Sequence, residues 1–135
     1  MQNTKQQATA FLILRIGIGI IFTVLGIQKL LGGNEVWTGV GSAMGFVGIK
    51  FSPAFWGLMA TLAELVGGIL LIIGLFTRYA AIALLFTMII AVILKIAIDG
   101  TFAGVSAPLT MLLIMIFFAI YGSGTNSVDA ARARK

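Results

Sequence analysis

Four long apolar runs constrain this chain more than any other feature of its sequence. They lie at about residues 9–31, 53–76, 79–98 and 107–121, in a chain of 135 residues that is 60% hydrophobic and 10% charged. A helix of about 20 apolar residues crosses a bilayer and satisfies its own backbone hydrogen bonds there. A β-barrel would instead show short segments of alternating polarity. We therefore predict an all-α fold, a four-helix transmembrane bundle that forms one domain over residues 1–135.

Local signals predict where the runs begin and end. Ser52 is placed to cap the second helix, with Pro53 at its first position, where a missing N–H costs nothing. Thr77 and Arg78 are expected to form the tight turn before the third helix. Ser106 is expected to cap the fourth. The first run is too long for a signal peptide and lacks small residues at its end, so we expect a retained anchor.

Positively charged residues near the helix ends predict the orientation. Four spans place both termini on one side, with six cations, Lys5, Arg15, Arg78, Arg132, Arg134 and Lys135, against three on the other, Lys29, Lys50 and Lys95. The positive-inside rule therefore predicts a multi-pass protein of the cell inner (cytoplasmic) membrane with both termini in the cytoplasm. The basic tail suits anionic lipid headgroups. Because no aromatic residues interleave with its charges, we do not expect nucleic-acid binding.

The connection between the first two spans, residues 32–52, is half apolar. Val36, Val40, Met44 and Val47 recur near helical spacing beside Trp37, which predicts a short amphipathic helix at the interface or over the mouth of the bundle. We favour a packed lid without ligand contact over a lid that touches a substrate.

The chain contains neither cysteine nor histidine, and this limits its chemistry. A disulfide, a thiol redox pair, an iron–sulfur cluster and any histidine-ligated haem or metal are excluded within the chain. An all-carboxylate site or a methionine-ligated haem would be unusual, and we expect no bound metal. Electron transfer would require a borrowed cofactor or a diffusible one such as a quinone.

Glu64 is the acidic residue closest to the middle of a predicted span, at about 18 Å from the cytoplasmic end. A charged carboxylate at that depth costs a few kcal/mol unless it is paired, protonated or hydrated. Its helical neighbours are small, namely Gly57, Ala60, Thr61, Gly67 and Gly68. Small residues permit close helix packing, so we expect Glu64 to point into the bundle.

Candidate partners for Glu64 come from the neighbouring spans. A stripe of the first helix, Arg15, Gly19, Phe22, Gly26 and Lys29, carries cations near both ends. On depth, the expected partner is Arg15, Lys95 or the amide of Gln28. Lys95 can alternatively pair with Asp99, four residues later. A structural ion pair, a polar site facing a ligand or quinone, and a proton or ion relay all remain open.

Several motifs resemble the DoxX family of small membrane proteins. The first helix carries RIGIGIIF from residue 15 and GIQKL at 26–30, and the second carries AELVGG at 63–68 followed by GLFTR at 74–78. The ending, GSG at 122–124 and SVD at 127–129, is similar as well. The resemblance covers essentially the whole chain, and it places Arg15, Gln28, Lys29 and Glu64 at the family's polar motif positions. Lys95 stands where many members would have histidine.

The resemblance implies a four-helix membrane bundle that, in some members, accompanies a quinone-linked oxidoreductase or a redox-stress complex. The expected role is therefore an accessory or quinone-interacting subunit of an oxidoreductase complex, with partner subunits supplying the redox centre. The alternatives are a non-catalytic scaffold or assembly factor and, ranked last, a small transporter or channel. The bundle could stand alone or form a homo-oligomer through its glycine faces. Whether the chain is itself an enzyme is left open.

Overall fold

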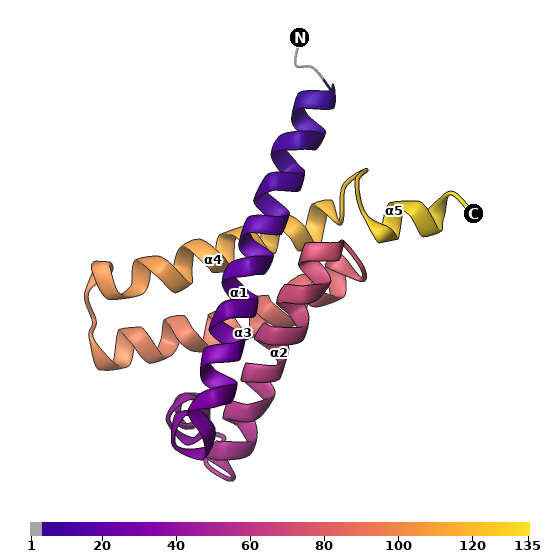
Figure 1. The fold of residues 1–135 in the computed structure, drawn as a ribbon. Helices are drawn as coiled ribbons and strands as arrows, with labels where there is room; N and C mark the ends of the chain where they lie inside the picture. Colours follow the sequence, from indigo (N-terminus) through magenta and orange to yellow (C-terminus); the bar gives the residue numbers. More distant parts are fainter. Residues whose placement is uncertain (1–3) are drawn as a thin grey trace.

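The computed structural model describes residues 4–135, so the first three residues of the predicted domain lie outside the described part. Within that part the elements are α1 (Thr4–Gly41), a 3₁₀ helix η1 (Ser42–Val47), α2 (Pro53–Ile73), α3 (Thr77–Ile98), α4 (Phe102–Tyr121) and the short α5 (Val128–Ala133) (Figure 1). Four of these helical segments are long and apolar enough to cross a membrane. The predicted all-α transmembrane fold is confirmed.

The four long helices form two hairpins, α1 with α2 and α3 with α4, which cross one another (Figure 1). Small residues bring α1 and α2 together. A Cβ atom added at Gly19 would lie 2.8 Å from the carbonyl oxygen of Gly68, and one added at Gly26 would lie 2.7 Å from the Cα of Leu65. Such close backbone contact is how membrane helices associate without a hydrophobic driving force between them.

The main apolar core lies where the hairpins cross. Its buried members come from all four long helices: Ile18, Phe22, Leu71, Ala81, Leu84, Met88, Met115 and Phe118. Away from the crossing, the α3–α4 hairpin extends away from the α1–α2 hairpin (Figure 1). The contacts between hairpins are therefore concentrated toward the end of the bundle where α4 finishes, which we call the termini end.

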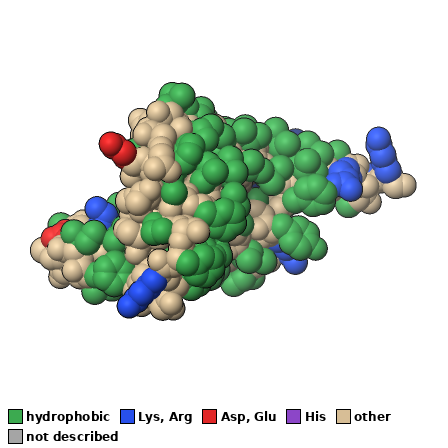
Figure 2. All heavy atoms as spheres, turned by 90° about the horizontal axis from the view of Figure 1, so that it is seen from below, with side chains coloured by type: hydrophobic (Ala, Val, Ile, Leu, Met, Phe, Trp, Pro, Cys, Tyr) green, Lys and Arg blue, Asp and Glu red, His purple; other side chains and the backbone are tan. Residues whose placement is uncertain are grey.

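The outer surface is apolar, as a lipid-facing surface requires. Large apolar side chains are exposed on every long helix. Figure 2 shows apolar side chains covering the middle of one face, with the charged side chains toward its edges. This distribution agrees with an integral membrane protein in contact with a lipid bilayer.

Three predicted helix boundaries are wrong. Thr77 and Arg78 are the first residues of α3, and the turn before them begins at Gly74, which adopts a left-handed conformation (φ 72°) and ends α2 at Ile73. α4 begins at Phe102 instead of Ala107, because Thr101 caps it by accepting a hydrogen bond from the Gly104 N–H at 3.1 Å. Pro108 lies inside the helix. The predicted caps therefore need correction.

Ser106 and Ser52 do not cap helices through their side chains. Ser106 donates to the carbonyl oxygen of Ala103 from within α4. Ser52 occupies the expected N-cap position before Pro53, but its side chain makes no capping hydrogen bond, and its backbone is left-handed (φ 49°). The start of α2 at Pro53 is confirmed, whereas the proposed hydroxyl cap is wrong.

Gly33 breaks α1 into two helical parts. Its backbone angles, φ 72° and ψ −160°, are accessible essentially only to glycine. The first part agrees with the predicted end of the first span at Leu31. Residues 34–47, which we call the connecting segment, continue as a short α-helix and then as η1, as the spacing of apolar residues predicts. The segment packs tightly on α2, because a Cβ atom at Gly57 would overlap the backbone carbonyl of Trp37.

Candidate functional site

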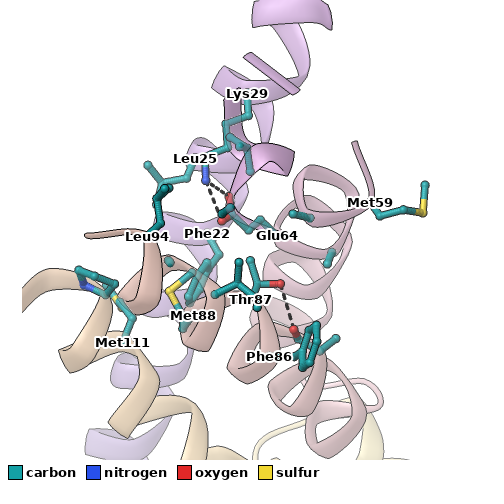
Figure 3. Close-up of a pocket in the computed structure, with 18 of the residues that line it drawn as sticks. Phe22, Leu25, Lys29, Met59, Glu64, Phe86, Thr87, Met88, Leu94 and Met111 are labelled. Atoms are coloured by element: carbon teal, nitrogen blue, oxygen red, sulfur yellow. Dashed lines mark hydrogen bonds and ion pairs between the residues drawn. The ribbon is translucent and has the colours of Figure 1, made fainter. Parts of the chain in front are cut away.

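An ion pair between α1 and α2 lies near the middle of the bundle. The Lys29 Nζ donates to both carboxylate oxygens of Glu64, each at 2.8 Å (Figure 3). The Glu64 side chain is 2% exposed and that of Lys29 is 29% exposed. Glu64 thus points inward to a cation from a neighbouring span, as its small-residue face predicts.

The partner expected for Glu64 was wrong: it is Lys29, not Arg15, Lys95 or Gln28. The close contacts of Gly19 with Ile72 and of Gly26 with Leu65 fix the antiparallel register of α1 and α2. That register places Lys29 about one turn from Glu64. Helical side chains lean toward the N-terminus of their own helix, so the long Lys29 side chain reaches back to the carboxylate.

A cavity of about 1030 Å³ lies beside this ion pair, between the two hairpins. Its walls come from α1, the connecting segment, α2, α3 and α4, and Phe22 and Met88 contribute from the buried core (Figure 3). Most of the lining side chains are aliphatic, aromatic or methionine. Its ionisable lining residues are Lys29, Glu64 and Lys95. Its volume is slightly above the range of about 300–1,000 Å³ found for small-molecule sites.

The connecting segment forms part of the cavity wall. Val40, Ala43 and Met44 line the cavity, with the last two buried. The Trp37 Nε1–H donates to the backbone carbonyl oxygen of Lys29 at 3.0 Å, which ties the segment to the backbone of α1 at the residue that supplies the cation. The segment is a packed lid, as expected, but one that faces the cavity, and this favours the alternative of a lid that touches a ligand.

Lys95 and Gln28 differ in their relation to the cavity. Lys95 lines it from α3 and is exposed. The expected ion pair with Asp99 is absent from the described residues, and the Asp99 carboxylate instead accepts a hydrogen bond from the Thr101 hydroxyl at 2.8 Å. Gln28 is exposed and lies outside the cavity lining. The structure therefore brings Lys29, Glu64 and Lys95 to one cavity and leaves Gln28 apart.

Arg15 belongs to a second polar cluster at the termini end. Its side chain, 2% exposed, donates to the carbonyl oxygens of Leu71 and Asn126, each at 2.9 Å, and to that of Ser123. We call residues 123–129 the C-terminal clasp. Arg15 ties this clasp to α1 and to the end of α2, and it makes no contact with Glu64.

Asp129 completes the clasp and caps α3. Its carboxylate accepts the N–H groups of Phe76 at 2.9 Å and Thr77 at 3.1 Å, and its own N–H donates to the Gly74 carbonyl oxygen at 3.0 Å. A carboxylate at a helix N-terminus is also favoured by the helix dipole. In the sequence, Asp129 is recognisable only as part of the SVD motif at residues 127–129 that resembles the DoxX family, and its capping role is not apparent. A capping residue 52 positions away leaves no local signal.

The polar side chains on the cavity wall can form hydrogen bonds to a bound molecule. The described residues contain no group of three or more histidine, cysteine or acidic side chains that could hold a metal ion. Glu64 already accepts two of the N–H groups of Lys29, whose third N–H and partial exposure leave it able to donate to a bound molecule. The site is therefore an apolar chamber with cationic donors on its wall.

Comparison with known proteins establishes the family of this membrane bundle. The DoxX family model matches residues 10–96, and the chain belongs to this family. It is 30% identical to an uncharacterized membrane protein of Mycobacterium tuberculosis, over 90% of this chain and 80% of that relative. It is 32% identical to a Bacillus subtilis protein named "Putative oxidoreductase CatD", over 87% and 83% of the two chains.

A third relative is an uncharacterized protein of Haemophilus influenzae, 33% identical over 96% of each chain. No solved structure matches the chain. The predicted family is thus confirmed, and the matched residues include Arg15, Lys29, Glu64 and Lys95.

Proposed function

We propose that this protein binds a quinone-class molecule in the cavity between its hairpins and serves as the membrane subunit of an oxidoreductase complex. The observation that carries the proposal is the apolar cavity of about 1030 Å³ with the Lys29–Glu64 ion pair on its wall. Small-molecule sites combine a mostly apolar lining with a few placed polar groups in this way. The name of the Bacillus subtilis relative supports an oxidoreductase connection.

The residues on the cavity wall fit a quinone. Its ring and apolar tail require a chamber lined by groups such as Phe22, Met88 and Met111. Its carbonyl oxygens accept hydrogen bonds, and Lys29 is a partly exposed donor on the cavity wall. A bound quinone would supply the redox chemistry, while Lys29, oriented by Glu64, would hold a carbonyl oxygen.

A partner subunit would supply the electrons to this site. The chain has no cysteine or histidine with which to hold a redox centre of its own. In this proposal the protein lies in the cytoplasmic membrane with both termini on the cytoplasmic side, as its cation distribution favours. A homo-oligomer is compatible with the same cavity.

Quinone binding tests the proposal through two variants. Lys29→Met removes the donor, and the Lys29→Met/Glu64→Gln double variant also removes the carboxylate charge that the first change leaves unpaired. Breaking a buried ion pair costs up to about 3–5 kcal/mol, whereas replacing both partners can be nearly neutral. The double variant should therefore fold better than either single variant. It should nevertheless bind decylubiquinone about tenfold or more weakly than wild type, because a charged donor is missing.

Equilibrium dialysis of the detergent-solubilised protein against decylubiquinone gives the affinity, and Lys50→Met is the control. Lys50 is an exposed lysine outside the cavity lining. Wild-type affinity in a well-folded double variant would refute the assigned role of Lys29.

A non-catalytic scaffold is the second candidate, because both carboxylate oxygens of Glu64 are already bonded to Lys29. In that case the ion pair only joins α1 to α2. The Glu64→Gln variant would then unfold more easily, with the same quinone content as wild type. Loss of bound quinone at unchanged stability favours the ligand site instead.

A further inference from the structure

The polar groups on the cavity wall include donors that have no partner in the described chain. The carboxylate of Glu64 is engaged by Lys29, and the Thr87 hydroxyl donates to the Ala83 carbonyl oxygen at 3.1 Å. Trp56, another lining residue, has an indole N–H that is buried without an acceptor in residues 4–135. The remaining group is the ammonium of Lys95, which can only donate.

Lys95 is the cavity cation without a carboxylate partner in the described chain. The salt bridge on this wall joins Lys29 to Glu64, and Asp99 bonds to Thr101. The charges of Lys29 and Glu64 cancel, so the cavity lining carries a net charge of +1 from Lys95. Lys95 lies in the last turn of α3, close to the end of that span.

We propose that the cavity binds a single-chain anionic amphiphile, with its carboxylate on Lys95 and its hydrocarbon chain in the apolar chamber. The proposal uses the same cavity as the proposed quinone site but depends on Lys95, and it does not require a redox partner. Charge complementarity selects an anionic head, because the ammonium of Lys95 has no carboxylate partner among the described residues.

The position of Lys95 in the helix gives the occupant its orientation. Seven residues separate it from Met88 of the buried core, a rise of about 10 Å. A head bonded near the end of α3 and a chain directed toward Met88 would follow the orientation of a lipid in one leaflet. One ammonium without a carboxylate partner, that of Lys95, matches one carboxylate, which favours a single-chain amphiphile over a two-chain phospholipid.

Binding of decanoate tests this inference. Carbon-13 carboxyl-labelled decanoate is titrated into the protein in zwitterionic phosphatidylcholine nanodiscs, with empty nanodiscs as the reference for partition into lipid. We expect saturable binding to wild type and a loss of affinity of about tenfold in Lys95→Met, as for removal of a charge-assisted hydrogen bond. Lys95→Arg should remain within about threefold of wild type, and Lys50→Met should equal it. Lys95→Gln repeats the test if methionine disturbs folding.

Several outcomes would overturn the inference. Equal decanoate binding by wild type and Lys95→Met would show that Lys95 only reaches the headgroup region of the bilayer. If Lys95→Met weakened the binding of the neutral analogue decanol as much as that of decanoate, recognition of the carboxylate charge would be excluded. Abolished decanoate binding in nanodiscs containing phosphatidylglycerol would identify an acidic phospholipid as the occupant. Decylubiquinone titrated in parallel separates the two proposals, because its binding depends on Lys29 and should survive Lys95→Met.

Discussion

Replacing Arg15 with methionine should destabilise the protein by about 2–4 kcal/mol while leaving the cavity intact. The guanidinium holds three carbonyl oxygens, those of Leu71, Ser123 and Asn126. A hydrogen bond to a charged group contributes about 1.5–3 kcal/mol, and part of that gain is offset by the cost of burying the arginine. After the substitution the buried Leu71 oxygen has no replacement partner, whereas water can reach the exposed residue Asn126.

Unfolding of the purified protein by SDS titration, followed by far-UV circular dichroism, measures this loss. Arg78→Met is the matched control, because Arg78 is exposed near the same end of the bundle. The Arg15→Lys variant should be more stable than Arg15→Met but less stable than wild type, because a single ammonium cannot reproduce the hydrogen-bond geometry of the planar guanidinium.

A truncated chain ending at Gly122 separates the clasp from other effects of Arg15. Truncation removes the Ser123 and Asn126 acceptors, so Arg15→Met should cost much less in the truncated chain than in the full one. Equal costs in the two chains, or a cost below about 0.5 kcal/mol in the full chain, would refute the assigned role of the C-terminal clasp.

Four further substitutions test close packing, helix capping and a hydrogen bond elsewhere in the bundle. Gly57→Ala should destabilise the protein by about 1–3 kcal/mol, because the added Cβ would overlap the Trp37 carbonyl. Gly39→Ala is the control and should be tolerated, because a Cβ there meets no atom within 4 Å. The same SDS titration compares the two variants. Asp129→Asn should cost about 1 kcal/mol by weakening the α3 cap, seen as faster amide exchange in the first turn of α3. Trp37→Phe should cost about 0.5–1.5 kcal/mol through loss of the bond to the Lys29 carbonyl and should leave α2 unaffected in hydrogen exchange.

The membrane fold and the inward face of Glu64 could be predicted from sequence because both follow from local patterns. Apolar length defines the spans, and small residues beside Glu64 define the packed face. The buried residues of α2 include the predicted Gly57, Thr61, Gly67 and Gly68. The predicted stripe on α1, from Arg15 through Gly19 and Phe22 to Gly26, is likewise buried.

The partners of the polar residues could not be predicted, because they depend on register and on distant chain segments. The depth of a residue along the helix axis does not include the tilt of its side chain toward the helix N-terminus, so the pairing of Lys29 with Glu64 was not predicted. Arg15 was grouped with Glu64 because both are polar and intramembrane, yet the acceptors of Arg15 lie more than 50 residues away, and all are backbone carbonyls. Backbone acceptors carry no residue-specific signal.

The size of the cavity also had no sequence signal. It results from the way the α3–α4 hairpin diverges from α1 and α2, which local periodicity does not specify. The connecting segment was expected, but its contribution to the cavity wall depends on the break at Gly33 and on close contact with α2.

The central claim is that the cavity between the hairpins holds a small lipophilic molecule, and native mass spectrometry of the gently extracted protein tests it most directly. Ala63→Phe would place a phenyl ring in the cavity, whereas Val66→Phe places the same side chain at an exposed position of the same helix. We expect wild type and Val66→Phe to retain a bound molecule of the quinone or amphiphile class and Ala63→Phe to lose it. Equal ligand content in all three proteins, or none in wild type, would contradict the account.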